Sequence, residues 1–544
     1  MQRDLQALSN SRFDLLVLGG GIQGACVAWE ATLRGLSVAL IDQSDFGAAT
    51  SANSLKIIHG GLRYLQTADI RRMRQSIRER QILMRIAPHL VHPLPVLVPI
   101  YGHGLKGKEA MFVALKLNDW ISCDRNRNLS DPQKQIPPGQ MLSRQRCQQQ
   151  VPGIDGPGLT GAATFHDAQV YNSERLTLAF VKSAAQAGAV VANYVAATGF
   201  LKTGNRVSGI TAHDRLTGNR FEIQANAVIN TSGPWLNQVL GQLPTPPAPQ
   251  PFAKAINVVL RQPLLDSPYA VAFKSSSEVA EQTKSRMLFV VPWRGTSMVG
   301  TLYSVCDQHP DSWQVHETEI HTLLEQINQA YAPAQLTRDD VTFVHGGLLP
   351  QTEVASNGEP ILAKRYRIQD HSREGHHGLL SVTGVKYTTS RSVAQKVVDY
   401  LFRCRDQTPP PSCSATTPLI GGAIDPVEEF VQQAVGHSQL SPAATRSLVY
   451  NYGSEYGDVF GDGVNDPAQV LTAQVRYAIA AEMAQTLKDV IFRRTKLGSA
   501  GEPDSNSVRL CAEVMAQELG WSQARTQLEL KPFGVSTSSE AVKK

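Results

Sequence analysis

The segment that decides the fold reads Leu15-Leu16-Val17-Leu18-Gly19-Gly20-Gly21-Ile22-Gln23-Gly24 and lies close to the N-terminus. An apolar run passes directly into a glycine-rich turn, and Gly19, Gly21 and Gly24 fit the pattern G-x-G-x-x-G. Between a strand and a helix, this pattern lets the backbone approach a pyrophosphate and places that group at a helix N-terminus. Residues 25–34 are typical of a helix, and Gly35 follows them as a stop signal. The sequence therefore predicts the start of a dinucleotide-binding βαβ unit.

A second apolar run, residues 37–41, ends at Asp42, where an acid accepts hydrogen bonds from the ribose of an adenine dinucleotide. This unit alone does not separate NAD from FAD. Residues 46–56 form a small, hydroxyl-rich run that can wrap closely around a cofactor, although such a composition is also typical of a surface loop. The run offers three hydroxyl groups for cofactor binding, on Thr50, Ser51 and Ser54. It favours FAD over NAD.

Further motifs follow along the chain: IHGGLRYL at 58–65, NTSGPW at 230–235, GVKYTT at 384–389 and DVIFRRT at 489–495. In this order they resemble the FAD-dependent glycerol-3-phosphate dehydrogenase family, within the superfamily of FAD-dependent DAO-type oxidoreductases. The matches extend over nearly the whole chain. We therefore interpret the chain as a divergent member of that family.

The resemblance implies an α/β fold with a Rossmann-type FAD-binding domain, a β-sheet substrate domain and a C-terminal all-helical domain. We expect residues 12–410 to form the oxidoreductase region, with a discontinuous FAD-binding core and a substrate-facing sheet at about 240–345. Residues 411–533 would form the helical domain, and residues 534–544 a polar tail. Apolar residues recur at helical spacing between Val475 and Ile491, which predicts a buried stripe there. Arg493 and Arg494 are expected to be solvated or in structural ion pairs.

The implied reaction is oxidation of sn-glycerol 3-phosphate to dihydroxyacetone phosphate, with hydride passing from C2 to flavin N5. His59 would act as the base, because an imidazole titrates close to neutral pH, although a histidine before two glycines is also often structural. On a helix, Arg63 would share a face with His59, and its guanidinium can bind a phosphate or an alkoxide. Lys386 matches the family's active-site lysine. Lys364 and Thr388 are further substrate contacts.

The chain is expected to return to the flavin at two glycines, Gly233 and Gly384. The second follows an apolar run at 379–383 and precedes a helix that we expect to start near Thr388. Backbone N–H groups and the positive end of that helix would favour negative charge on the flavin. Gly384 and Thr388 are therefore assigned to cofactor binding with Gly233.

One departure from the family pattern concerns the substrate. Where the family reads Gly-x-Arg-Pro, this chain carries Leu349, so an arginine that helps to hold the substrate is replaced. A hydrogen bond to a charged group contributes about 1.5–3 kcal/mol. Lys364 could compensate, or the fold could act on a different hydroxy- or amino acid. A third interpretation is a flavin-binding protein without catalysis.

Composition limits the remaining function classes. The 544 residues carry a formal net charge of +5, which suits an anionic substrate or lipid surface and does not indicate nucleic-acid binding. The 7 cysteines are dispersed without metal-ligand spacing, which predicts reduced thiols, a cytoplasmic protein and no metal site.

The electron acceptor and the surroundings of the protein are less defined by the sequence. The family includes peripheral enzymes that reduce membrane quinones, and related enzymes that reduce oxygen. Residues 105–121 combine lysines with apolar and aromatic residues, which indicates either a helix at a membrane surface or a buried helix. Candidate partners are thus a phosphorylated alcohol, a quinone or oxygen, the inner face of the cytoplasmic membrane, and a second copy of the chain.

Overall fold

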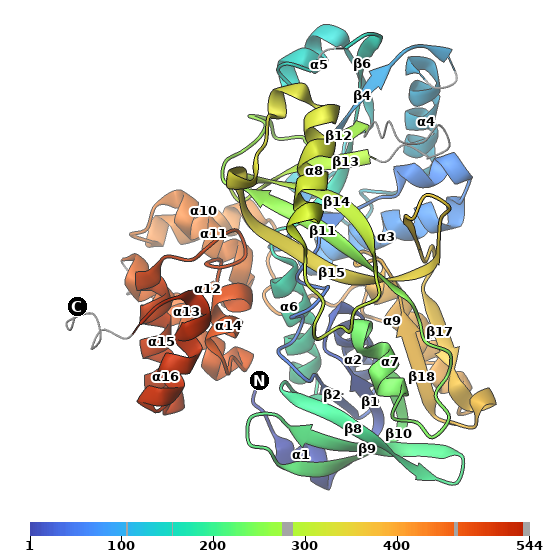
Figure 1. The fold of residues 1–544 in the computed structure, drawn as a ribbon, viewed down its shortest axis with the longest axis vertical. Coiled ribbons are helices and arrows are strands. Elements are labelled where there is room, and N and C mark those ends of the chain that lie inside the picture. Colours follow the sequence, from blue (N-terminus) through green and yellow to red (C-terminus); the bar gives the residue numbers. More distant parts are fainter. Residues whose placement is uncertain (105–106, 155, 275–286, 462–465, 537–544) are drawn as a thin grey trace. The chain divides into compact units, whose positions relative to one another are not determined.

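The computed structural model describes residues 1–104, 107–154, 156–274, 287–461 and 466–536, and its ribbon is shown in Figure 1. The chain divides into two compact units. Unit 1 consists of Met1–Ala52, Asn172–Gln250 and Lys364–Lys544. Unit 2 consists of Asn53–Tyr171 and Pro251–Ala363.

The sheet of unit 1 runs in the order β17, β18, β10, β1, β2, β7, and β9 pairs with both β10 and β8. β1, β2, β7, β10 and β18 pair in parallel, and β17 joins at the edge in antiparallel orientation. Its strands are β1 (Arg12–Leu18), β2 (Val38–Ile41), β7 (Val190–Ala192), β8 (Val195–Thr203), β9 (Arg206–Asp214), β10 (Arg220–Asn230), β17 (Arg367–Asp370) and β18 (Leu379–Thr383). All four residues of β2 are buried, because parallel strands with covered faces need side chains that are apolar in succession.

Helices α2 (Ile22–Leu33), α6 (Ser173–Gln186) and α9 (Ser390–Arg403) pack beside this sheet, with α2 in contact with the other two (Figure 1). An ion pair joins α2 to α9, since Arg34 Nη1 lies 2.5 Å from Asp399 Oδ1. Gly35 ends α2 with a φ of 80°, a left-handed conformation that suits glycine. Two shorter helices, α1 (Leu5–Asn10) and α7 (Leu236–Leu240), complete this part of unit 1.

The C-terminal part of unit 1 is helical, as expected, and is drawn in orange to red from α10 onward in Figure 1. Its helices are α10 (Val427–His437), α11 (Pro442–Tyr452), α12 (Tyr456–Phe460), α13 (Pro467–Glu482), α14 (Leu487–Asp489), α15 (Ser505–Leu519) and α16 (Gln523–Leu530). The expected apolar stripe is buried, with Val475, Leu487 and Val490 packed in one cluster with α15, which confirms its role as core. Of the expected polar tail, residues 537–544 lie outside the described residues.

Unit 2 is built on a second sheet, in the order β16, β15, β11, β14, β13, β12, β4, β6, β3, with β5 paired to β6. Its strands are β3 (Ile57–Ile58), β4 (Val91–Tyr101), β5 (Gln140–Ser143), β6 (Leu159–Val170), β11 (Phe252–Leu260), β12 (Ala270–Lys274), β13 (Met287–Trp293), β14 (Thr296–Cys306), β15 (Val341–Val354) and β16 (Pro360–Leu362). Its helices are α3 (Ile70–Ile86), α4 (Lys108–Ile121), α5 (Arg144–Gln150) and α8 (Glu317–Ala330).

Helix α8 covers one face of the second sheet. Its apolar residues Ile320, Leu323 and Ile327 are buried in one cluster with residues of β11, β13 and β14. Side chains alternate along a strand, so every second residue of β11 and β15 faces away from α8. That other face carries Leu349, which stands where the family resemblance implies an arginine.

These findings confirm the expected fold class: an α/β nucleotide-binding sheet, a second β-sheet region and a C-terminal helical region. The first two residues of the expected 105–121 helix lie outside the described residues, and α4 occupies the rest.

Candidate active site

The glycine-rich turn of unit 1 is fixed by close backbone contacts. Gly19 has a φ of 100°, and a Cβ built on it would lie 2.7 Å from the Cα of Ser232. A Cβ on Gly24 would lie 1.9 Å from the carbonyl oxygen of Gly19. Neither position can carry a side chain without moving β1, β10 or α2. These glycines therefore let β1, the residues after β10 and the start of α2 approach closely at the turn.

The first turn of α2 is capped from outside the helix. Its N-cap residue, Gly21, provides no side chain, and the Ser51 Oγ instead accepts a hydrogen bond from the Ile22 N–H at 2.9 Å. A Cβ on Gly21 would meet only that Oγ, at 3.1 Å. The sequence predicted Ser51 as a cofactor contact, and it lies at the helix end where the pyrophosphate of FAD would bind.

Asp42 lies beside this turn at the end of β2. Its Oδ2 accepts from the Gly20 N–H at 2.7 Å, and its Oδ1 accepts from the Ser44 N–H at 2.8 Å. Burial raises the pKa of Asp42 to about 6, and the backbone donors at Ser44 and Gly20 oppose that rise. A carboxylate has about four lone-pair sites, so acceptor capacity remains for ribose hydroxyls. The glycine turn, Ser51 and Asp42 thus fit the adenosine diphosphate half of FAD.

Two more glycines predicted to bind cofactor follow β10 and β18. Gly233 has a φ of 56°, and nothing lies within 4 Å of a Cβ built on it, so the backbone faces open space. At Gly384 a Cβ would lie 3.3 Å from the Nε2 of Gln23, which places this glycine beside the start of α2. Both parts of the discontinuous core therefore return to the same region of unit 1.

The segment after Gly384 is held against α6. The Tyr387 hydroxyl donates to the Ser173 carbonyl at 2.8 Å and lies 2.9 Å from the Thr177 Oγ1. Helix α9 begins at Ser390, two residues later than expected. Lys386 is half-buried, whereas Thr388 is only 2% exposed, so little of its surface is open to a ligand. The roles of Lys386 and Thr388 stay predictions.

His59 and Arg63 belong to unit 2. His59 follows β3 and precedes the short 3₁₀ helix Leu62–Thr67, which begins after Gly61 at a φ of 86°. The four-residue spacing therefore does not place the two side chains on one helical face, because the turn intervenes. The His59 ring is half-buried with its edge towards the Tyr64 ring, at a centroid distance of 5.8 Å, and Arg63 is exposed.

The backbone next to His59 is held by a buried ion pair that the sequence did not indicate. Asp167 Oδ1 accepts from the Gly60 N–H at 2.5 Å and lies 3.0 Å from Arg80 Nη1. Burial raises the pKa of Asp167, and the Arg80 guanidinium opposes that rise. A Cβ on Gly60 would lie 2.4 Å from Arg80 Nη1, so a side chain there would displace the Arg80 guanidinium. The pair fixes the peptide that follows the proposed base.

The strand β15 places Leu349 on the face away from α8. Leu349 pairs with Ala253 of β11, and Ala253 pairs in turn with Val305 of β14, so this row across the sheet is apolar. Lys254 follows Ala253 in sequence, but its side chain faces α8, where its Nζ lies 3.4 Å from Glu319 Oε2. Lys254 therefore does not replace the missing arginine.

His345 precedes Leu349 by four residues on β15 and shares its face. The ring is 2% exposed, lies against Phe343 at a centroid distance of 4.9 Å, and its Nδ1 is 3.1 Å from Asn53 Oδ1. The His345 ring is thus packed and buried within unit 2.

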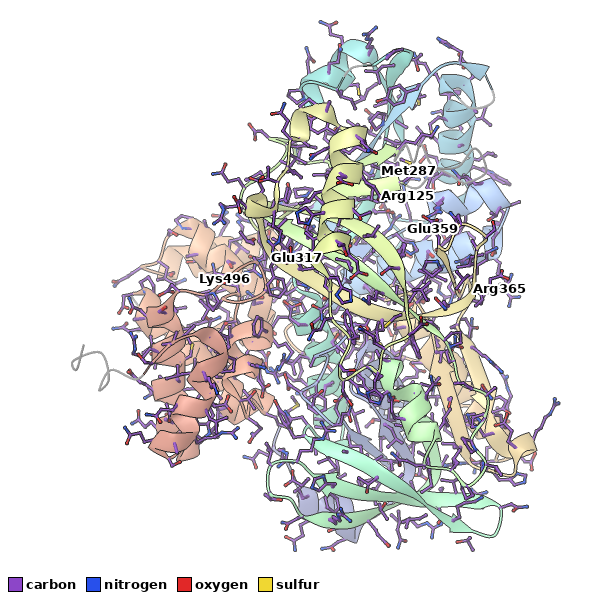
Figure 2. The ribbon with its side chains drawn as sticks, viewed as in Figure 1. Arg125, Met287, Glu317, Glu359, Arg365 and Lys496 are labelled. Atoms are coloured by element: carbon purple, nitrogen blue, oxygen red, sulfur yellow. The ribbon has the colours of Figure 1, made fainter. Side chains whose placement is uncertain are left out.

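Three predicted residues have less defined surroundings. The Ser54 Oγ accepts from the Lys56 N–H at 3.3 Å, within unit 2, and Thr50 is half-buried in unit 1. Lys364 is exposed at the start of the last segment of unit 1, and Figure 2 shows its neighbour Arg365 on the stretch that leads into β17. Among the described residues, no group of three or more His, Cys, Asp or Glu side chains is arranged to hold a metal ion.

Family models and known relatives match nearly the whole chain. Residues 14–397 match the family model "FAD dependent oxidoreductase", and residues 412–526 match "C-terminal domain of alpha-glycerophosphate oxidase". A glycerol-3-phosphate dehydrogenase of Synechocystis sp. is 31% identical over 98% of this chain and 97% of its own length. The mitochondrial enzyme of Mus musculus is 30% identical over 97% of this chain and 74% of its own length.

Solved structures agree on the fold. The glycerol-3-phosphate dehydrogenase of Bacillus halodurans, solved in complex with FAD, aligns over 97% of this chain and 95% of its own, with a TM-score of 0.73 and 23% identity. The L-alpha-glycerophosphate oxidase of Mycoplasma pneumoniae, with FAD bound, aligns over 75% of this chain and 99% of its own, with a TM-score of 0.52 and 14% identity.

Proposed function

This chain belongs to the FAD-dependent glycerol-3-phosphate dehydrogenase family, and on that premise we propose that it oxidises sn-glycerol 3-phosphate to dihydroxyacetone phosphate. The observation that carries the proposal is the 31% identity to the Synechocystis enzyme over 98% of the chain. The glycine turn with Asp42 and Ser51 supports FAD as the cofactor.

FAD, when bound, supplies the acceptor for the hydride that leaves C2 of the substrate. We assign His59 to removal of the proton from the C2 hydroxyl, because a neutral imidazole can take a proton near pH 7. Arg63 and Lys386 would bind the developing oxyanion or the phosphate, with Lys364 and Thr388 as further substrate contacts. Support for His59 comes from the Asp167 clamp on Gly60, which restricts the backbone beside the ring.

The alternative proposal keeps the fold and changes the substrate. It rests on Leu349, whose row across the sheet with Ala253 and Val305 offers no charge to a phosphate. A hydroxy- or amino acid carries one carboxylate charge, which is less than the charge of a phosphate monoester, so its binding loses less when the arginine is absent. A non-catalytic flavin-binding protein is the third candidate, and reduction of the flavin by any substrate would exclude it.

Anaerobic titration of the purified flavoprotein distinguishes these proposals. We expect glycerol 3-phosphate at micromolar to millimolar concentration to bleach the oxidised flavin absorbance, since that substrate would reduce it. Bleaching by a hydroxy- or amino acid and not by glycerol 3-phosphate would contradict the main proposal. Lys386→Ala should slow reduction, and Lys488→Ala, an exposed lysine of α14, serves as the matched control.

We further propose that the protein is cytoplasmic and associates with the inner face of the membrane through α4. Phe112, Val113, Leu117 and Trp120 are 48%, 55%, 44% and 76% exposed, and of the residues of α4 only Leu115 is buried. Lys116 Nζ lies 5.5 Å from the Phe112 ring centroid, so positive charge accompanies this apolar surface. Such a helix suits the headgroup region of an anionic bilayer. Among the described residues, no helix is long and apolar enough to cross a membrane.

Co-sedimentation with anionic lipid vesicles tests this surface. Trp120→Ser combined with Phe112→Ser should reduce the bound fraction, because both remove apolar area from the exposed face of α4. Leu528→Ser is the matched control, since Leu528 is 67% exposed but lies on α16. Equal binding of all proteins would refute the assignment to α4.

The acceptor and the oligomeric state are proposed on the family pattern alone. To separate quinone reduction from oxygen reduction, the rate of flavin reoxidation is measured with a quinone under anaerobic conditions and with oxygen alone under aerobic conditions. A homodimer is a further prediction, which light scattering of the FAD-loaded protein tests.

A further inference from the structure

A buried cluster of charges joins the C-terminal helical part of unit 1 to its nucleotide-binding part. At its centre is Asp45, whose carboxylate is fully buried between Arg493 and Arg494. Arg494 binds it with both ends of the guanidinium, at 2.8 Å and 2.7 Å, and the Nε of Arg493 binds the same carboxylate. Both arginines come from the π-helical turn Val490–Arg494. Sequence reasoning left them as solvated or paired; the structure shows them paired.

Asp45 belongs to the short segment that also carries the ribose-binding acid. Asp42 accepts from the Gly20 N–H at 2.7 Å, and the Gly47 N–H donates to the Gly20 carbonyl at 3.0 Å. Between these two bonds, the Phe46 ring covers Gly20, where a Cβ would lie 2.4 Å from Phe46 Cδ1. Residues 42–47 are therefore bound along their length to the turn that would hold FAD.

The C-terminal part holds this segment through a second connection as well. Asn193 donates to Asp45 Oδ1 at 3.2 Å and to the Met483 carbonyl at 2.8 Å. Tyr194 donates its backbone N–H to the Ser44 carbonyl at 3.0 Å and its hydroxyl to Asp489 Oδ1 at 2.6 Å. Side chains and backbone from the C-terminal helices thus reach the 42–47 segment through β7–β8 as well as directly.

The cluster keeps its charge in spite of burial. The two guanidinium groups outweigh the cost of desolvation and hold the pKa of Asp45 at about 2. Because Asp45 has no exposed surface, removal of Arg494 would leave part of its charge unpaired away from water. Asp45 would then either take up a proton or move towards solvent, and a move towards solvent would draw Phe46 and Asp42 away from Gly20.

We propose that Arg494, supported by Arg493, is a positioning residue for FAD: through Asp45 it fixes residues 42–47 against the glycine turn, so that the C-terminal helical domain contributes to cofactor retention. The proposal rests on FAD as the cofactor and not on the identity of the substrate. Neither arginine is assigned a contact with FAD. If the two arginines had a purely structural role, their ion pairs with Asp45 would stabilise the folded chain, and the affinity for FAD would not depend on them.

The rate of FAD release from the purified full-length holoenzyme separates these two roles. After dilution, released FAD is followed by its rise in fluorescence, without any substrate, so the result is independent of whether glycerol 3-phosphate is oxidised. We expect Arg494→Gln to release FAD about tenfold faster or more, since a distorted ribose site loses hydrogen bonds to FAD. Arg494→Lys keeps the charge but loses the bidentate geometry, so its rate of FAD release should lie between those of the unsubstituted protein and Arg494→Gln.

Arg476→Gln is the matched control. Arg476 is also an arginine of the C-terminal helices, and its Nε lies 2.9 Å from Glu518, but both side chains are exposed. Release from Arg476→Gln at the unsubstituted rate, with faster release from Arg494→Gln, would support the proposal. It is overturned if Arg494→Gln releases FAD at the unsubstituted rate, or if both variants release it equally fast. Should Arg494→Gln fail to fold, Arg494→Lys decides, and an unchanged rate in that variant overturns the proposal.

Discussion

Two glycine-containing stretches of this chain show how differently fold and substrate depend on sequence. In the turn from Gly19 to Gly24, the backbone of one residue occupies the space that a side chain of another would need. In the stretch from Gly346 to Pro350, the backbone pairs with β11 in regular register, and Leu349 stands where the family resemblance implies an arginine. The hydrogen bonds of a β-ladder join backbone groups, so leucine in place of arginine leaves the pairing of the strands unchanged. We therefore expect the fold to constrain the proposed cofactor site and to leave the proposed substrate position at Leu349 free to change.

The largest expected effect concerns catalysis by His59 at the proposed substrate site. His59→Asn should lower the rate of flavin reduction by glycerol 3-phosphate by about 10²–10⁴-fold, the usual contribution of a general base. Stopped-flow absorbance measures the rate, and the yellow colour of the purified protein shows that FAD is retained. His437→Asn, in an exposed position on α10, should leave the rate unchanged. A variant at His59 with the unsubstituted rate would remove it from the mechanism.

Gly24→Ala tests the glycine turn, where backbone contacts leave no room for a side chain. The added methyl group would lie 1.9 Å from the Gly19 carbonyl oxygen, so α2 must move away from β1. Overpacking of this kind costs about 1–3 kcal/mol, so the dissociation constant for FAD should rise by about tenfold to hundredfold. Gly436→Ala in α10 is the control, since nothing lies within 4 Å of its Cβ. Unaltered FAD affinity in Gly24→Ala would mean that the turn adapts more freely than its contacts indicate.

The same contrast explains what the sequence could predict. The glycine turn, Asp42, the helix that follows the turn and the apolar stripe between Val475 and Ile491 follow from local patterns, since spacing and composition within a few residues determine them. The βαβ unit was predicted for the same reason, whereas the rest of the fold class was implied by the family resemblance. The assignments of His59, Lys386 and the other site residues rest on a family resemblance and stay predictions.

The contacts that local patterns could not reveal join distant parts of the chain. Asp167 and Gly60 are 107 positions apart, and Asp45 and Arg494 are 449 positions apart. No periodicity connects such positions, and each residue alone is typical of a solvated surface. The predicted role of Ser51 was local, but its hydrogen bond to the Ile22 N–H depends on how the loop folds back, which the composition does not specify.

Restoring the missing arginine sharpens the comparison further. Leu349→Arg would place a guanidinium in the row with Ala253 and Val305, and Leu349 is half-buried, so the longer side chain can extend along the sheet. If glycerol 3-phosphate is the substrate, we expect its dissociation constant to fall by about tenfold, the lower end of what a charge-assisted hydrogen bond contributes. Leu348→Arg, on the face towards α8, should instead destabilise the protein, because Leu348 is 4% exposed. Weaker binding of glycerol 3-phosphate to Leu349→Arg would favour the alternative substrate.

An effect of similar size is a pH dependence of FAD binding that originates at Asp42. Burial raises its pKa to about 6 in the folded protein, so the group keeps its proton to a higher pH than in the unfolded chain. Its contribution to apoprotein stability is therefore present below the ordinary pKa and is lost as pH rises through about 6. FAD acts in the opposite direction, because ribose hydroxyls donate to the carboxylate and favour its charged form. The dissociation constant for FAD should rise by about tenfold between pH 7 and pH 5, and Asp42→Asn should bind more weakly with a flat profile. An equal pH dependence in that variant would assign the effect to another group and leave the ribose contact of Asp42 without support.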